Sequence, residues 1–139
     1  MIDGNEYIKV VREYFSFLTT EFDFKLTEEI VNGSFFYRIR YEDKTRAVTI
    51  SYEDAEDYLS VFISILQNCE LPDYDDKTQT LHLNRLNAVV LSTVDKSEIR
   101  LNNEYFLKFQ TKDELERKLL KSAKELRLCL KHFNELQIV

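Results

Sequence analysis

Apolar and polar residues alternate along residues 22–66, in four short runs with polar breaks between them. A period of two is typical of strands in a sheet that buries one face. The Asn32-Gly33 pair favours a tight hairpin after the first run, because both residues tolerate positive φ. The pattern predicts an antiparallel meander with strands at about 22–30, 35–41, 48–52 and 58–66.

Helical spacing replaces this alternation near the start of the chain. Residues 3–20 carry an apolar stripe that includes Ile8, Val11, Phe15 and Leu18. Recurrence at three and four residues predicts an amphipathic helix, and Asp3 is its expected N-cap.

A second helix is predicted near the end of the chain. The segment 111–114, Thr-Lys-Asp-Glu, fits a capping box, in which the side chains at both ends bind free amides of the first helical turn. A long apolar stripe follows it, made of Leu115, Leu119, Ala123, Leu126, Leu130 and Phe133.

The middle of the chain has a mixed pattern. Residues 67–80 read as a polar surface connection that contains Pro72. We favour a short helix near 82–92, although 88–94 suits a strand equally well. Ile99 and Leu101 alternate with Arg100 like a short strand, and residues 105–109 suit either a strand or a helix start.

The order of these elements predicts an α+β fold. We expect an N-terminal helix, a four-stranded antiparallel meander and C-terminal helices packed on one face, in a two-layer sandwich. The 139 residues contain no repeat or low-complexity linker, so we predict a single domain over 1–139.

Composition narrows the classes of function. The formal net charge is −6, which disfavours generic binding to the phosphate backbone of nucleic acids. No apolar run approaches the ~20 residues of a membrane span, and charged residues interrupt the N-terminal segment. Cys69 and Cys129 lie in no CxxC motif. We therefore expect a cytoplasmic protein with reduced thiols and no membrane contact.

Motifs that bind cofactors or metals are missing. The isolated Gly4 and Gly33 make no phosphate-binding loop, and the spacing of the two histidines and two cysteines does not indicate zinc. The acidic run 73–76 starts like a calcium loop but lacks the glycine and glutamate that such a loop needs. We predict no catalytic residue, no cofactor and no metal.

Candidate contact residues come from the meander and the loop after it. Phe36 and Phe62 fall in the polar register beside Arg38 and Arg40, where they either form a binding patch or lie beneath a helix or loop. We favour the covered alternative.

Tyrosines beside acidic turns are a second source of contacts. They either form an acidic, aromatic docking face or pack beneath the helices, and we favour packing. The candidate protein-binding residues are Phe36, Phe62, Tyr52, Glu53, Asp54, Asp57, Asp73, Tyr74, Asp75 and Asp76.

Three segments resemble small bacterial proteins of unknown function, some of which are assigned as immunity proteins beside polymorphic toxins. They are YFSFLTTEFDFKL, VTISYEDAEDYLSVFIS and ELERKLLKSAKELRLCLKHF. The resemblance implies a non-enzymatic binder that neutralises a toxin domain, and an acidic inhibitor would associate quickly with a basic toxin.

Two alternatives to an immunity-type inhibitor stay open. One is a small acidic secretion-chaperone-like or adaptor protein that acts as a homodimer. The other is an enzyme whose site forms only in the folded chain, with a histidine and perturbed carboxylates in a deep pocket. The sequence leaves open a monomer or a homodimer.

Overall fold

The computed structural model describes residues 3–66, 71 and 80–133, and the chain has an α+β fold. Contacts divide it into two compact units, Met1–His82 and Leu83–Val139, which we call the sheet unit and the helical unit. One domain over 1–139 stays a prediction. The candidate residues Asp73, Tyr74, Asp75 and Asp76 lie outside the described residues.

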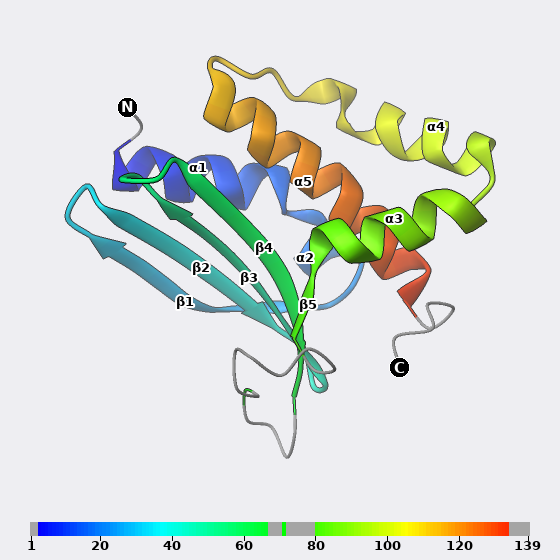
Figure 1. Ribbon diagram of the computed structural model, residues 1–139, viewed down its shortest axis with the longest axis horizontal. Helices are drawn as coiled ribbons and strands as arrows, with labels where there is room; N and C mark the ends of the chain where they lie inside the picture. Colours follow the sequence, from blue (N-terminus) through cyan, green and yellow to red (C-terminus); the bar gives the residue numbers. More distant parts are fainter. Residues whose placement is uncertain (1–2, 67–70, 72–79, 134–139) are drawn as a thin grey trace. The chain divides into compact units, whose positions relative to one another are not determined.

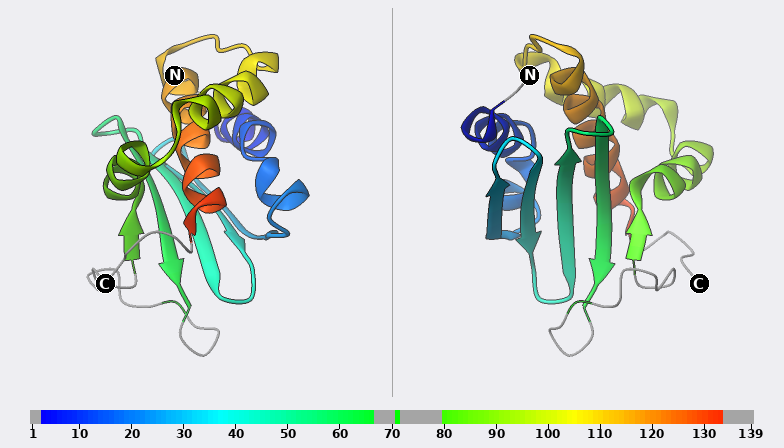
Figure 2. Two further views of the ribbon diagram at one scale, coloured as in Figure 1. Left: turned by 90° about the vertical axis from the view of Figure 1, so that its right-hand side faces the viewer. Right: turned by 60° about the vertical axis from the view of Figure 1, so that its left-hand side comes forward.

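The sheet unit starts with helices and continues as a meander (Figures 1 and 2). Its strands lie in the order β1-β2-β3-β4-β5, and all neighbours are antiparallel. The elements are α1 (Gly4–Tyr14), α2 (Phe17–Thr20), β1 (Lys25–Asn32), β2 (Phe36–Glu42), β3 (Arg46–Glu53), β4 (Tyr58–Ile65) and β5 (Thr80–His82).

The prediction of four strands is wrong, because β5 adds a fifth beside β4. Its three residues are too few to show a period in the sequence. The expected hairpin between the first two strands is confirmed, with Gly33 at a φ of 58°.

The first helix ends earlier than predicted, at Tyr14, and the chain turns before α2 begins at Phe17. Phe15 and Phe17 are both fully buried. Residues two apart do not share a face of a continuous helix, so the break lets both rings enter the core. The first strand also begins later than predicted, at Lys25, because Asp23 adopts a φ of 62°.

Aromatic packing holds α1 against one face of the sheet. Tyr37 and Tyr52 are neighbours on β2 and β3, and both are buried on the face that we call the tyrosine face. Their rings lie 5.1 and 6.5 Å from the ring of Tyr7 on α1. The Tyr7 hydroxyl donates a hydrogen bond of 3.1 Å to the carbonyl oxygen of Ile50. Tyrosine packing, the interpretation that we favoured, is therefore confirmed for this face.

Residues 83–133, the described part of the helical unit, form four helical elements. They are α3 (Leu83–Thr93), α4 (Lys96–Tyr105), the 3-10 helix η1 (Phe106–Lys108) and α5 (Glu114–Lys131). The helix predicted near 82–92 is confirmed. The strand suggested by Ile99 and Leu101 is wrong, because both residues belong to α4. Asp95 starts that helix by accepting a hydrogen bond from the Ser97 amide.

The last helix begins at Glu114. A capping box with Thr111 as the N-cap would start it two residues earlier, at Lys112. Asp113 is the N-cap and accepts a hydrogen bond of 2.9 Å from the Glu116 amide. The Glu116 carboxylate accepts in turn from the Lys112 amide, at 3.1 Å. Asp113 thus takes the N-cap role predicted for Thr111, and the Glu116 carboxylate reaches one residue further back than in a capping box, to the amide before the N-cap.

Buried polar groups join α4 to α5. Asn102 donates from its amide nitrogen to the Lys124 carbonyl and accepts from the Arg127 guanidinium, both at 2.8 Å. The Arg127 guanidinium also lies 3.9 Å from the centre of the Tyr105 ring. Hydrogen bonding and a cation–π contact thus compensate the burial of this charge.

Tyr7→Phe should lower the free energy of unfolding by about 1 kcal/mol, because it leaves the Tyr7 ring in place and removes one buried hydrogen bond. Tyr58→Phe is the matched control, since Tyr58 is 52% exposed and should change stability little. Urea unfolding of both variants measures the difference, and equal stabilities would contradict the importance of the bond to Ile50.

Stability should fall as the pH rises above about 10. Burial raises the pKa of Tyr41 to about 12, and it also raises the pKa values of Tyr7 and Tyr52. Tyrosines of the unfolded chain ionise near pH 10, so the unfolded state loses protons first. Each such tyrosine then contributes a slope of about 1.4 kcal/mol per pH unit until its folded form ionises.

Urea unfolding between pH 8 and 11.5 measures this slope. Tyr41→Phe should make it shallower above pH 10. A stability that stays constant through this range would show that the tyrosines ionise equally in the folded and unfolded chain.

Candidate functional site

A hollow of about 310 Å³ lies on the sheet face opposite the tyrosine face. We call this the hydroxyl face, because short hydroxyl side chains fill its centre. Ser51 on β3 pairs with Ser60 on β4. Thr49, two residues before Ser51 on β3, lies on the same face. The lining residues are Phe36, Arg38, Arg40, Thr49, Ser51, Glu53, Tyr58, Ser60, Phe62, Ser64, Leu71 and Thr80.

Cross-strand register explains why the surface is hollow here. Arg38 lies opposite Ser51, which in turn lies opposite Ser60, so one row across the sheet ends in two short side chains. Long side chains stand in the rows on either side, with Phe36 in one and Phe62 in the other. Small residues surrounded by large ones leave a depression on a pleated surface.

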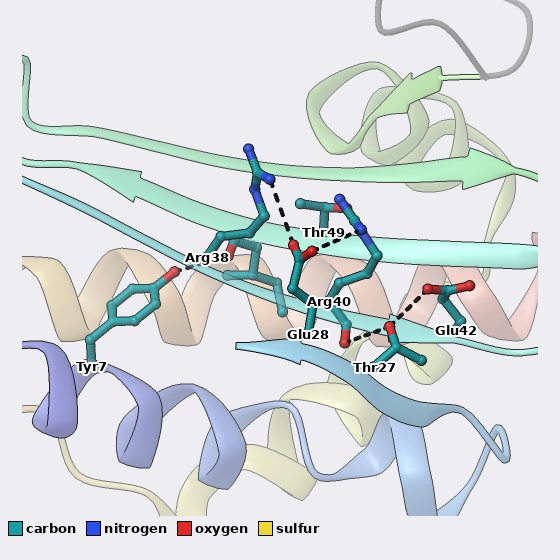
Figure 3. A network of polar contacts seen from close by, with 8 residues as sticks. Tyr7, Thr27, Glu28, Arg38, Arg40, Glu42 and Thr49 are labelled. Atoms are coloured by element: carbon teal, nitrogen blue, oxygen red, sulfur yellow. Dashed lines mark hydrogen bonds and ion pairs between the residues drawn. The ribbon is translucent and has the colours of Figure 1, made fainter. Parts of the chain in front are cut away.

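One wall of the hollow is a charged cluster of strands β1 and β2 (Figure 3). The Glu28 carboxylate lies 3.4 Å from the Arg40 guanidinium and 3.6 Å from that of Arg38. Arg40 also donates to the Thr49 hydroxyl at 3.5 Å. Two guanidiniums thus share one carboxylate, which leaves a surplus positive charge on this wall.

The aromatic candidates from the sequence line the same hollow. Phe36 and Phe62 are both half-buried, and the guanidinium of Arg38 lies 5.1 Å from the centre of the Phe36 ring. The ring of His82 lies 5.7 Å from that of Phe62. The structure therefore brings Phe36 and Phe62 to one site, where they border the hydroxyl groups.

Two buried polar atoms at this site have no hydrogen-bond partner among the described residues. They are Oγ of Ser60 and Oε1 of Glu28. Native proteins pair nearly all such atoms, because an unpaired buried donor or acceptor costs about 1–3 kcal/mol. The hollow therefore carries unused hydrogen-bonding capacity.

A second exposed surface lies at one end of the sheet, where two hairpin turns meet. The Asp54 amide donates to the Phe35 carbonyl at 2.9 Å, which joins the β1–β2 turn to the β3–β4 turn. Phe35 and Tyr58 are 68% and 52% exposed there. We call this surface the acidic corner; it consists of Phe35, Glu53, Asp54, Glu56, Asp57 and Tyr58.

The predicted contact residues thus fall into groups that meet at Glu53, which also lines the hollow. Glu53, Asp54 and Asp57 belong to the acidic corner. Tyr52 is buried on the tyrosine face, where its hydroxyl donates a 2.7 Å hydrogen bond to the Asp57 carboxylate. That bond supports the turn from beneath. Phe35 was not among the predicted contact residues, because its exposure depends on where the turn ends.

Other chemistry-bearing residues are built into the helical unit. His132 contacts Glu98 at 3.0 Å. Burial, and secondarily the charge of Glu125, raises the pKa of the Cys129 thiol to about 12, so this cysteine stays protonated at neutral pH. Among residues 3–66, 71 and 80–133, no group of three or more metal-binding side chains occurs. In the same part of the chain, no helix has the length and apolar character of a membrane span.

Comparison of the chain with protein-family models, with curated proteins and with solved structures finds no match. The two surfaces of the sheet unit, the hollow and the acidic corner, are therefore the candidate functional sites.

Ser60→Val should raise the free energy of unfolding by up to about 1 kcal/mol, because it removes an unpaired buried hydroxyl and favours a strand. Thr49→Val is the matched substitution and should lower stability, since the Thr49 hydroxyl accepts from Arg40. Urea unfolding compares the two, and a loss of stability in Ser60→Val would show that the Ser60 hydroxyl is satisfied in solution.

Proposed function

We propose that this chain is a cytoplasmic, non-enzymatic protein-binding module that docks a basic partner at the acidic corner. The supporting observation is the exposure of Phe35 and Tyr58 among the carboxylates of a single pair of turns. Aromatic side chains are typical of the buried centres of protein interfaces, and polar side chains of the rim around them.

Charge distribution supports a basic partner. Residues 1–82 contain 8 lysines and arginines against 17 aspartates and glutamates, a formal charge of −9. Residues 83–139 contain 11 against 8, a formal charge of +3. The sheet unit would thus attract a basic surface, and its field would speed association at low salt.

An immunity-type inhibitor of a basic toxin domain is the form of this function that we propose. Such an inhibitor needs fast association and a rigid surface more than it needs reactive groups. The acidic corner lies on two hairpin turns of a five-stranded sheet, and the Tyr52–Asp57 hydrogen bond supports one of them.

The homodimeric adaptor is the second candidate. Leu101 and Leu107 favour it, because these side chains of the helical unit are 62% and 76% exposed. Light scattering on the purified chain separates the candidates, since an obligate dimer would double the mass and cover such leucines.

Removal of the acidic corner should abolish capture of a basic partner from the native host. The test variant combines Glu53→Gln, Glu56→Gln and Tyr58→Ala, and it retains Asp57 because Tyr52 depends on it. We expect at least a tenfold loss of affinity, in keeping with the loss of an aromatic anchor, and a wild-type association rate that falls with added salt.

The control variant is Glu13→Gln with Glu104→Gln, which removes two exposed carboxylates elsewhere. Capture by tagged protein, mass spectrometry and surface plasmon resonance give the readout. Equal capture by the test and control variants, or capture that is insensitive to salt, would contradict docking at the acidic corner.

A further inference from the structure

The two sides of the hollow on the hydroxyl face differ in chemistry: one carries guanidiniums and the other a hydroxyl group. Its charged wall is on β2, where Arg38 and Arg40 project from alternate positions. Ser60 stands on β4, two strands away. Neighbouring strands lie about 4.8 Å apart, so roughly 10 Å separates the backbone of β2, which carries the guanidiniums, from that of β4, which carries the hydroxyl.

The donors of Arg38 are available on the charged wall. Its contacts among the described residues are the ion pair with Glu28, at 3.6 Å, and the Phe36 ring. Neither is a hydrogen bond within 3.5 Å, whereas a guanidinium has five N–H donors in a plane that matches a carboxylate. The other carboxylate of the lining, Glu53, lies in the next row, opposite Phe36.

The space between the two sides has a flat, partly apolar boundary. Phe36 and Phe62 stand in the rows on either side of the Ser51–Ser60 pair. A volume of about 310 Å³ is at the small end of ligand pockets, which suits a ligand of roughly ten heavy atoms. A ring above the short serines would contact aromatic edges and leave the guanidinium wall accessible.

We propose that this hollow is a binding site for a small aromatic carboxylic acid with a polar group at the opposite end of its ring. The carboxylate accepts hydrogen bonds from Arg38 and Arg40, and the ring lies over Ser51 between Phe36 and Phe62. The distal polar group pairs with the Ser60 hydroxyl, which has no partner among the described residues. This site does not depend on the proposed protein-binding function.

The test is a titration of the nitrogen-15-labelled full chain with 4-hydroxyphenylacetate, followed by NMR. We expect saturable shifts at the Arg38 and Arg40 side-chain N–H groups and at the Ser51 and Ser60 amides. Ligand-efficiency limits predict a dissociation constant of a few millimolar or tighter. Acetate, inorganic phosphate and 4-methylphenol, which each lack part of the ligand, should bind at least tenfold more weakly.

Substitutions with opposite expected effects separate ligand binding from a structural role. Arg38→Gln should weaken binding at least tenfold, while Lys44→Gln, which removes a positive charge from an exposed turn, should leave it unchanged. Glu28→Gln should strengthen binding severalfold, because it removes the carboxylate that competes for both guanidiniums. If the arginines served only to pair strands, Glu28→Gln would alter stability and leave binding unchanged.

Ser60→Ala tests the distal end of the site. It should remove the preference for 4-hydroxyphenylacetate over phenylacetate and leave phenylacetate binding intact. Several results would overturn the proposal: shifts scattered over surface lysines, an absence of saturation, phosphate binding as tight as that of the aromatic acid, or unchanged binding in Arg38→Gln. The amide spectrum of each variant is compared with that of the wild type, and only variants with the wild-type fold are titrated.

Discussion

Burial of aromatic rings on one side of the meander is the constraint on which the rest of the sheet unit depends. Tyr7 of α1 packs against Tyr37 and Tyr52 and bonds to the backbone of β3 through its hydroxyl. Because side chains alternate along a strand, placing these rings inward assigns every intervening residue to the other face. The same step that forms the core therefore creates the hydroxyl face.

The hydroxyl face lowers the stability of the fold, and this suggests that it is retained for a function. Glu28, Arg38 and Arg40 desolvate charges with long ion pairs, and the Ser60 hydroxyl is buried without a partner among the described residues. An apolar or fully paired surface would be more stable. Strained or unsatisfied groups often mark sites where a ligand supplies the missing interaction. The acidic corner, by contrast, is a solvated surface whose carboxylates cost little until a partner arrives.

Periodic patterns that extend over many residues were the reliable guide to the fold. Alternation over the central segment predicted four of the five strands, and helical spacing predicted the N-terminal, third and last helices. The short strand β5 was not predicted, because its three residues are too few to show a period. Ile99 and Leu101 misled for a similar reason, since three residues of alternation occur within α4.

Local patterns along the chain were enough to predict the α+β class, the Asn32-Gly33 hairpin and the register that sets Phe36 and Phe62 on the face opposite the tyrosines. These features depend on local backbone preference and on a repeat of two or 3.6 residues. The folded chain was needed to place Ser60 in the same hollow as Arg38 and to bring Phe35 to the acidic turn. Such groupings depend on which strands become neighbours, and long-range pairing leaves no period in a single chain.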